Sequence, residues 1–359
     1  MKRHFHTFDA LRFFAFFKVF LLHIPITTFP LFNIFREGGG IGVVFFFVLS
    51  GFLITYIILE EKSNTGQFNL KKFFMRRILR IWPLYYLMVG FAYCTPFLLS
   101  LFNLSSSSEG YEPNWLMSLL FLENYQIIAT GSHPNVSPLT VMWSLCIEEH
   151  FYILWGILLY FISIKKLPVL IIVSILVSLI ANLFFLKLGI LNQEILTNLW
   201  YFAFGAIPAY LLVRYREKFE SFIQQTPAAY KVLVILLTVL YVFLSPWLSF
   251  NYQVLVEPII FGALFSSIIC IIIPDQNKFK IADRHFLSRL GIYTYGLYIY
   301  HTIVINFLLQ VFKRFHLSTE QPLYALLLIL ISLFATVLIS KISYQLIERP
   351  FLQLKKHFT

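Results

Sequence analysis

The sequence is poor in charged residues. Aspartate, glutamate, lysine and arginine make up 13% of its 359 residues, about half the roughly 25% of an average soluble domain. Apolar residues account for 59% and come in long runs, such as residues 169–186 and 232–244. A run approaching 20 apolar residues is long enough for a membrane-spanning helix. The shortage of charge therefore argues against a soluble fold, and the lack of alternating polarity argues against a membrane β-barrel.

Cysteine is also scarce. The three cysteines, Cys94, Cys146 and Cys270, all lie in apolar segments, which is typical of packing residues rather than of disulfides or metal ligands. We therefore expect no metal site. The net charge of +11 is distributed in short clusters beside the apolar runs. Such clusters encode membrane topology, so we expect membrane lipids and no nucleic acid as partners.

The apolar runs predict an all-α, polytopic integral-membrane bundle of about ten transmembrane helices. The first run carries Asp9, Arg12, Lys18 and His23, which makes it too polar for a cleavable signal peptide. No linker or internal repeat interrupts the chain, so we expect one membrane domain over residues 1–359. The expected spans are residues 9–29, 40–60, 77–101, 140–162, 167–186, 195–213, 231–249, 253–273, 289–311 and 321–346.

The distribution of lysine and arginine predicts the orientation. With the N-terminus in the cytoplasm, most of the 28 Lys and Arg residues lie on the cytoplasmic side, as the positive-inside rule requires. The longest loop on the outside, residues 102–139, has neither. An even number of spans then returns the C-terminus to the cytoplasm. Within the outer loop, the apolar patch at residues 115–122 is too short to span and is expected at the interface or as a re-entrant segment.

Ionisable residues in the first span are candidates for function, because charge inside a membrane is costly. Arg12 and His23 are eleven residues apart, close to three helical turns, so they share a face about 16 Å apart along the axis. Asp9 lies one turn before Arg12 and can pair with it. The structural alternative is a snorkelling arginine and a hydrogen-bonded core histidine. Lys18 lies off this face and is expected to snorkel or to pair with a partner.

Three arginines occur where the third span begins. Arg80 is four residues after Arg76 and three after Arg77, so the three guanidinium groups can share one helical face. Topology explains the basic residues before them but does not require Arg80, which is one turn into the apolar helix. Guanidinium groups bind phosphate oxygens in a bidentate manner. The pattern therefore favours a phosphorylated ligand that approaches from the cytoplasm.

The fourth span carries two adjacent carboxylates, Glu148 and Glu149. Ser144, Glu148 and Tyr152 are spaced by four and share one face. A buried carboxylate needs a partner, and Glu148 could orient a histidine, with His23 as the first candidate. The alternative is a polar clamp between helices.

Together these segments resemble the acyltransferase-3 family of integral-membrane O-acyltransferases. The motifs extend from the first span to the C-terminal region. They are Arg12 with His23, Phe46-Phe47-x-x-Ser50-Gly51-Phe52, Arg77-x-x-Arg80 with Pro83, Trp143-Ser144-Leu145-x-x-Glu148-x-x-Phe151-Tyr152, Tyr295-x-x-Tyr298-x-x-His301, and Glu348-x-Pro350. Many relatives carry a further C-terminal extracytoplasmic domain, and we interpret this sequence as the stand-alone form without it.

The resemblance implies transfer of an acyl group, usually acetyl, from cytoplasmic acyl-CoA to a hydroxyl of an envelope glycan sugar or its lipid-linked precursor, in a bacterial plasma membrane. Arg12, Arg77 and Arg80, supported by Arg76, would hold the phosphates of acetyl-CoA. His23 would be the general base or a transient acyl carrier, and Glu148 would orient a histidine. The acyl-CoA is a substrate, so no permanently bound cofactor is expected. A transporter or flippase of lipid-linked glycans is the main alternative, because intramembrane Arg, Glu and His residues also mark transport paths.

The orientation can be tested by labelling with a membrane-impermeant thiol reagent in cells lacking other reactive cysteines. A cysteine at Ser106, in the long outer loop, should react from outside, whereas one at Asn64 should not, because it lies between the second and third spans. The opposite pattern of labelling would invert the topology.

Overall fold

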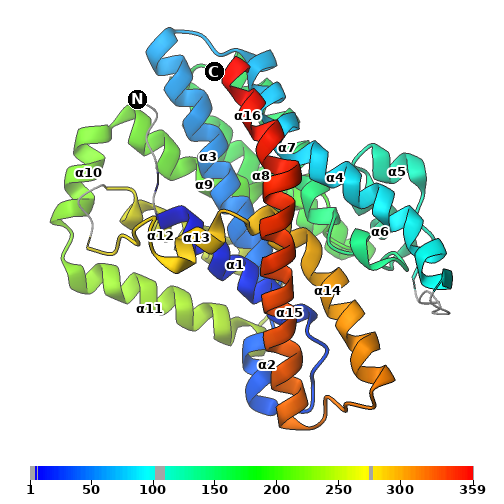
Figure 1. Cartoon of the computed structure of the whole chain (residues 1–359). Helices are drawn as coiled ribbons and strands as arrows, with labels where there is room; N and C mark the ends of the chain where they lie inside the picture. Colours follow the sequence, from blue (N-terminus) through cyan, green and yellow to red (C-terminus); the bar gives the residue numbers. More distant parts are fainter. Residues whose placement is uncertain (1–4, 6, 102–109, 275–277, 359) are drawn as a thin grey trace.

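The computed structural model describes residues 5, 7–101, 110–274 and 278–358 (Figure 1). These residues are mainly helical, and an isolated bridge between Tyr111 and Pro134 is the one β pairing among them. The helices of six or more residues are α1 Thr7–His23, α2 Pro30–Arg36, α3 Ile41–Thr65, α4 Leu70–Leu101, α6 Glu123–Thr130, α7 Trp143–Phe161, α8 Leu167–Leu188, α9 Ile195–Arg214, α10 Arg216–Gln225, α11 Ala228–Leu244, α12 Gln253–Ile272, α13 Phe286–Gly291, α14 Thr294–Arg314, α15 Pro322–Ser343 and α16 Arg349–Leu354.

Nine helical stretches within the described ranges are long and apolar enough to cross a membrane. They coincide with the second to tenth predicted spans, which confirms a multi-pass helical membrane protein. The first predicted span is shorter than expected, because α1 has 17 residues and ends at His23 rather than near residue 29. Pro25 disfavours helical geometry in the residue before it. The helix therefore stops at His23.

Helix α3 lies at the centre of the bundle and packs on α9 at very short range. A Cβ atom on Gly51 would lie 2.1 Å from the carbonyl oxygen of Phe202, and one on Gly205 would lie 1.9 Å from that of Val48. Only glycine permits backbones to approach so closely, as at many helix contacts in membranes. Gly51 therefore turns one face of α3 towards α9, and the preceding Ser50 faces elsewhere.

Helix α1 is enclosed by α3, α13 and α14. A Cβ atom on Gly291 would lie 1.8 Å from the Asp9 carbonyl oxygen, so α13 abuts the start of α1. On another side of α1, Lys18 is buried and its Nζ donates hydrogen bonds to the carbonyl oxygens of Phe35, at 2.8 Å, and Glu37, at 2.6 Å. Lys18 thus pairs with the carboxyl end of α2, in agreement with the partner-paired alternative.

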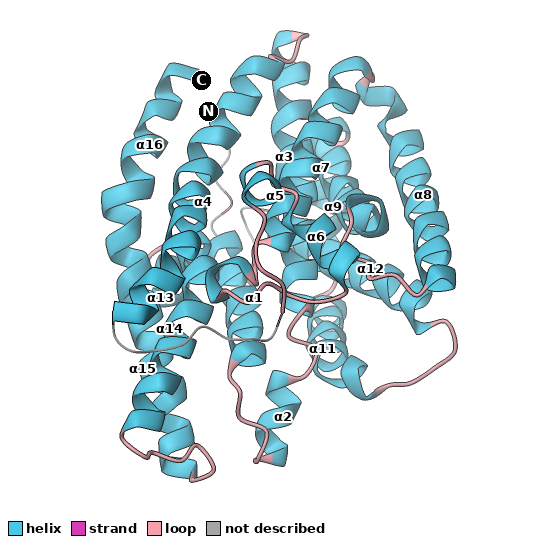
Figure 2. Ribbon diagram, turned by 90° about the vertical axis from the view of Figure 1, so that its right-hand side faces the viewer, coloured by secondary structure: helices cyan, strands magenta, loops and turns pink. Residues whose placement is uncertain are grey.

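The segment between α4 and α7 forms two short helices, α5 (Trp115–Leu119) and α6, which lie beside α4 (Figures 1 and 2). Tyr85 of α4 donates a hydrogen bond to the Ser118 carbonyl oxygen at 2.7 Å. Glu123 is fully buried and accepts hydrogen bonds from Tyr111 and Ser118. Burial raises the pKa of Glu123. The apolar patch predicted at the interface is therefore anchored to α4, and it remains exposed at Trp115.

The last helix is longer than predicted. Residues Pro322–Phe358 form one continuous helical stretch (Figure 1), in which Tyr344–Glu348 is a single π-helical turn. Pro350 follows this turn and cannot donate a backbone hydrogen bond. The helix continues past residue 346, where the tenth predicted span ends. The π turn buries the side chain of Glu348, whose Oε1 has no hydrogen-bond partner in the structure.

Because α3 and α9 are in backbone contact, adding one methyl group to a glycine at this contact should lower the stability of the protein strongly. Gly51→Ala should destabilise the protein by about 3 kcal/mol or more, because its Cβ meets backbone atoms that cannot move independently. Gly90→Ala is the matched control within a spanning helix, since a Cβ there meets nothing within 4 Å. It should be neutral or slightly stabilising. Thermal unfolding in detergent measures both, and equal midpoints would contradict the close contact.

Candidate active site

A cavity in the middle of the bundle brings together most of the residues selected from the sequence. Arg12 of α1, Arg77 and Arg80 of α4, and Glu148 of α7 all line it. Its volume is about 110 Å³, which holds several water molecules or a phosphate-sized group. This is well below the roughly 300 Å³ or more of sites for whole small molecules. A large ligand would therefore occupy it with only one of its parts.

The three arginines in the cavity differ in how their charge is balanced. Arg12 forms an ion pair with Asp9, one turn earlier on α1, as the spacing predicts. Arg77 and Arg80 make no hydrogen bond or ion pair within the described residues, and the buried Nε of Arg77 has no partner. The Arg77 guanidinium lies 5.8 Å from the ring centroids of both Phe73 and Tyr152. Two guanidinium groups are thus available to an anion.

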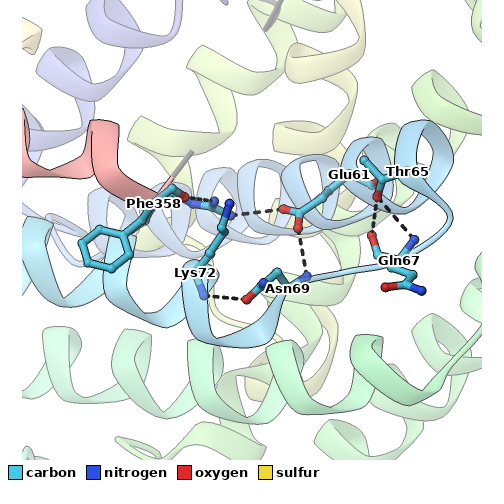
Figure 3. Close-up of polar contacts among 7 residues, drawn as sticks. Glu61, Thr65, Gln67, Asn69, Lys72 and Phe358 are labelled. Carbon is cyan, nitrogen blue, oxygen red and sulfur yellow. Dashed lines mark hydrogen bonds and ion pairs between the residues drawn. The ribbon is translucent and has the colours of Figure 1, made fainter.

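Arg76, grouped with Arg77 and Arg80 from the sequence, is not among the residues that line the cavity. Its Nη2 forms an ion pair with Glu61 at 3.2 Å, and its Nη1 donates a hydrogen bond to the carbonyl oxygen of Phe358 at 2.7 Å. The same Glu61 accepts a hydrogen bond from the backbone of Asn69 at 2.9 Å (Figure 3). Arg76 therefore joins the end of α3, the start of α4 and the C-terminal helix.

Glu148 lies on the cavity face of α7 together with Ser144 and Tyr152, as the four-residue spacing predicts. Its Oε2 accepts a hydrogen bond from Tyr152 at 2.7 Å, and its Oε1 accepts one from Ser50 of α3 at 3.2 Å. Arg77 and Arg80 are close enough to act on its charge. The expected pairing of Glu148 with His23 is not found. The carboxylate instead belongs to the arginine cavity.

His23 pairs with another histidine. Its Nδ1 lies 3.2 Å from Nε2 of His301 on α14, and the two ring centroids are 4.8 Å apart. His301 is fully buried, and its Nδ1 lies 2.6 Å from the carbonyl oxygen of Tyr298. The His23 Nδ1 also lies 2.9 Å from the carbonyl oxygen of Val19. The sequence indicated an intramembrane histidine at position 301 but not this partner.

The hydrogen bonds of the pair fix its tautomers. A carbonyl oxygen can only accept, so Nδ1 of His23 carries a proton, which is shared between the Val19 carbonyl oxygen and Nε2 of His301. Nδ1 of His301 likewise carries a proton towards Tyr298. The His301 Nε2 that faces the protonated Nδ1 of His23 is therefore an acceptor. Consequently, Nε2 of His23 is the unprotonated nitrogen, and it has no hydrogen-bond partner within the described chain. This nitrogen is able to take a proton.

Tyr298 connects the arginine cavity with the histidine pair. Its ring lines the cavity, its hydroxyl lies 2.7 Å from that of Ser144, and its carbonyl oxygen holds His301. On the other side of the pair, Arg36 and His133 are close enough to act on the charge of His23. Burial lowers the pKa of His133, which keeps that ring neutral near neutral pH. Ser50, Ser144, Tyr152 and Tyr298 lie in motifs that the sequence identified without giving them roles.

The arrangement combines an anion-binding half and a proton-accepting half within one bundle. Phosphate groups suit the unpaired guanidinium groups, and a neutral imidazole nitrogen suits proton removal from a hydroxyl. Within the described residues, no three His, Cys, Asp or Glu side chains are grouped to hold a metal ion. Such a site, in a helical membrane bundle, contains the groups that transfer from a phosphorylated donor to a hydroxyl requires.

The comparison with known proteins gives the family. The model of an acyltransferase domain, acyltransferase-3, matches residues 5–341. The chain therefore belongs to the acyltransferase-3 family, as its motifs indicate. No solved structure matches the chain significantly.

Curated relatives are longer than this chain. The peptidoglycan O-acetyltransferase OatA of Listeria monocytogenes is 26% identical, and the match covers 95% of this chain and 55% of OatA. A Staphylococcus aureus protein named as a putative O-acetyltransferase is also 26% identical, over 88% of this chain and 53% of its own length. The chain thus spans about half the length of the curated relatives it matches.

The different surroundings of the arginines predict different effects of the same substitution. Arg80→Lys should weaken binding of acetyl-CoA by about tenfold, because lysine keeps the charge but loses the bidentate geometry. Arg76→Lys should leave the affinity within about twofold and instead lower the thermal midpoint, because it weakens the contacts to Glu61 and Phe358. Isothermal titration calorimetry and thermal unfolding measure the two quantities. Equal losses of affinity would show that Arg76 also contacts the donor.

Proposed function

We propose that the protein is an O-acetyltransferase that moves an acetyl group from cytoplasmic acetyl-CoA to a hydroxyl of a cell-envelope glycan or its lipid-linked precursor. Family membership supports acyl transfer, and the relatives named as O-acetyltransferases support acetyl as the group and oxygen as the acceptor atom. The observation that carries the donor side of the proposal is the pair of unpaired arginines, Arg77 and Arg80, at the central cavity.

The donor binds from the end of α3 and α4 that carries the basic residues. Arg77 and Arg80, with Arg12 held by Asp9, contact phosphate groups of the coenzyme. The small cavity volume allows only the narrow part of the donor to pass deeper. About 16 Å separates Arg12 from His23 along α1, a distance that suits an extended pantetheine arm. The thioester thereby reaches the region of Tyr298 and the histidine pair.

His23 takes the proton from the acceptor hydroxyl at its Nε2. The hydroxyl oxygen then bonds to the thioester carbonyl carbon, the carbon–sulfur bond breaks, and the thiolate of coenzyme A leaves. The positive charge that forms on His23 is stabilised by its Nδ1–H, which donates to Nε2 of His301. His301 is therefore a positioning residue. A histidine that carries the acetyl group briefly is the alternative route over the same nitrogen.

Glu148 acts on the donor side in this scheme. Its hydrogen bonds from Tyr152 and Ser50 hold a carboxylate within reach of the arginine charges, and this limits their mutual repulsion before the coenzyme arrives. We propose that Glu148 sets the arginine geometry rather than orienting His23. The predicted pairing of Glu148 with His23 is therefore not part of the mechanism.

The identity of the acceptor and the type of membrane are proposed from the names and sources of the relatives. Relatives named for peptidoglycan and their bacterial sources support a glycan acceptor and a bacterial plasma membrane. The termini lie in the cytoplasm in this proposal, and residues 1–359 form one membrane domain. Phe5 packs on Phe52 and Tyr56 of α3, while Phe358 contacts Arg76, so the first and last described residues both lie towards the carboxyl half of α3.

The catalytic role of His23 can be tested by replacement with glutamine. His23→Gln keeps a hydrogen-bonding side chain but cannot take the proton, so transfer from radiolabelled acetyl-CoA should fall at least about 100-fold. Binding of acetyl-CoA should be unchanged, because the arginines lie about three turns away. His357→Gln, at an exposed position near the C-terminus, is the matched control and should keep full activity.

His301→Phe extends the same experiment. It removes one of the two acceptors of the His23 Nδ1–H, leaving the Val19 carbonyl oxygen, and it does not remove the base. Activity should therefore decrease less than in His23→Gln, and its pH profile should shift. Near-normal turnover of His23→Gln would locate the base elsewhere. A wild-type protein that binds acetyl-CoA but neither transfers nor hydrolyses it would contradict an enzymatic function and favour transport.

A further inference from the structure

A second cavity lies beside the amino-terminal half of α3. It has a volume of about 290 Å³ and is lined by residues of α3, α9 and α12, of the segment before α3 and of the turn Ser245–Trp247. Ile41 and Val44 of α3 line it, whereas the arginine cavity is lined by α3 residues between Val43 and Ile54 and so extends further along the same helix. The second cavity is therefore nearer to the end of α3 opposite Glu61 and Arg76. In the proposed topology this is the outer half of the membrane.

The cavity is lined by polar side chains whose hydrogen-bonding capacity is not fully used. Ser245 is 1% exposed and lies beside Glu257, whose carboxyl group can accept a hydrogen bond from its hydroxyl. Gln253 donates from Nε2 to Oε2 of Glu257 at 3.4 Å. The ring of Tyr241 lies 4.9 Å from that of the cavity-lining Phe261, and its buried hydroxyl has no hydrogen-bond partner within the described residues. Buried hydroxyls without partners are costly, so this set is suited to a ligand that supplies the missing hydrogen bonds.

The charge of the cavity narrows the class of ligand. Glu257 is the one charged residue among those that line it. The nearby Lys18 is committed to the carbonyl oxygens of Phe35 and Glu37. No arginine or lysine is among the described residues that line the cavity, so it lacks the cationic groups that a second site for coenzyme A would need. A carboxylate and an amide bind neighbouring hydroxyl groups well, and the rings of Tyr201 and Phe261 offer apolar faces to a sugar ring.

The position of the cavity relates it to the histidine pair. The segment Gly38–Gly40 lines the cavity on one side, and a Cβ atom on Gly39 would lie 2.2 Å from Cβ of Leu22, the residue before His23. The backbone of this segment therefore stands between the cavity and the end of α1. A sugar in the cavity is separated from His23 by one layer of backbone, so it cannot itself be the sugar that reacts.

We propose that this cavity is a glycan subsite, in which Glu257, Gln253 and Ser245 bind a sugar unit of the acceptor chain next to the unit that is acetylated. The inference rests on the proposed function for the identity of the acceptor. Binding of a remote unit holds the reacting unit at His23 and gives a preference for chains over single sugars. The volume, close to the lower limit of small-molecule sites at roughly 300 Å³, matches one sugar ring.

The test measures binding without the donor, so it does not depend on catalysis. Purified full-length protein in lipid nanodiscs is titrated with fluorescently labelled peptidoglycan glycan fragments of one and of three disaccharide units. The wild type should bind the longer fragment about tenfold more tightly. Glu257→Gln, which keeps the shape but removes the charge, should lose most of this preference, and Ser245→Ala should lose part of it.

Two controls distinguish a loss of glycan binding at the subsite from unfolding of the protein and from failure of the proposed function. Glu320→Gln, at an exposed position before α15, should keep the preference, and all variants should bind acetyl-CoA as the wild type does. An unchanged preference in Glu257→Gln, or equal binding of both fragments by the wild type, would overturn the subsite. Failure of the proposed function would instead be seen as a lack of acetyl transfer by the wild type, a separate measurement.

Discussion

Arg77 and Arg80 carry charge into an apolar bundle, and among the described residues neither forms an ion pair; much of the surrounding structure is explained by this charge. Arg12, which also lines the cavity, is neutralised by Asp9. Glu148 is held by Ser50 and Tyr152 rather than by a direct ion pair with either arginine. Arg80 is exposed, whereas Arg77 is partly buried and its buried Nε has no partner among the described residues. A protein that needed only stability would gain by pairing Arg77, because an unpaired buried charge is costly. The unpaired guanidinium groups are explained if an anionic substrate binds to them.

The tight packing of α1 and α3 keeps this cavity in place. Gly51 and Gly205 bring α3 and α9 into backbone contact, and Gly291 allows α13 to abut the start of α1. Helix α1 is short and carries Asp9, Arg12 and Lys18, so apolar burial alone would hold it weakly. Lys18 and the carbonyl oxygens at the end of α2 add polar contacts on its far side. The helix thereby presents Arg12 to one compartment and His23 to another.

Helix α3 orders the functional elements along the bundle. Its carboxyl end carries Glu61, which Arg76 clamps to the C-terminal helix, and its middle lines the arginine cavity. Its first turns line the second cavity, which contains Glu257 and no arginine or lysine among its described lining residues. The arginine-lined cavity and the carboxyl-lined cavity are thus arranged along one helix. This arrangement suits a reaction in which a phosphorylated donor and a hydroxylated acceptor enter from opposite ends.

The sequence determined the spanning helices and the faces that its polar residues share, because hydrophobicity and spacing act within one helix. Spacing along the helix correctly predicted that Ser144, Glu148 and Tyr152 share one face. The family motifs indicated that Arg12, Arg77 and Arg80 act together, and these three residues line one cavity. Tertiary structure decided which helices meet. In the folded protein, His23 contacts His301, 278 residues away. Arg76 binds Glu61 and Phe358 instead of lining the arginine cavity, and Glu148 accepts hydrogen bonds from Ser50 and Tyr152. The tertiary structure also formed the cavity at Glu257. Helical periodicity gives the direction of a side chain, but the partner that it meets depends on how distant helices pack.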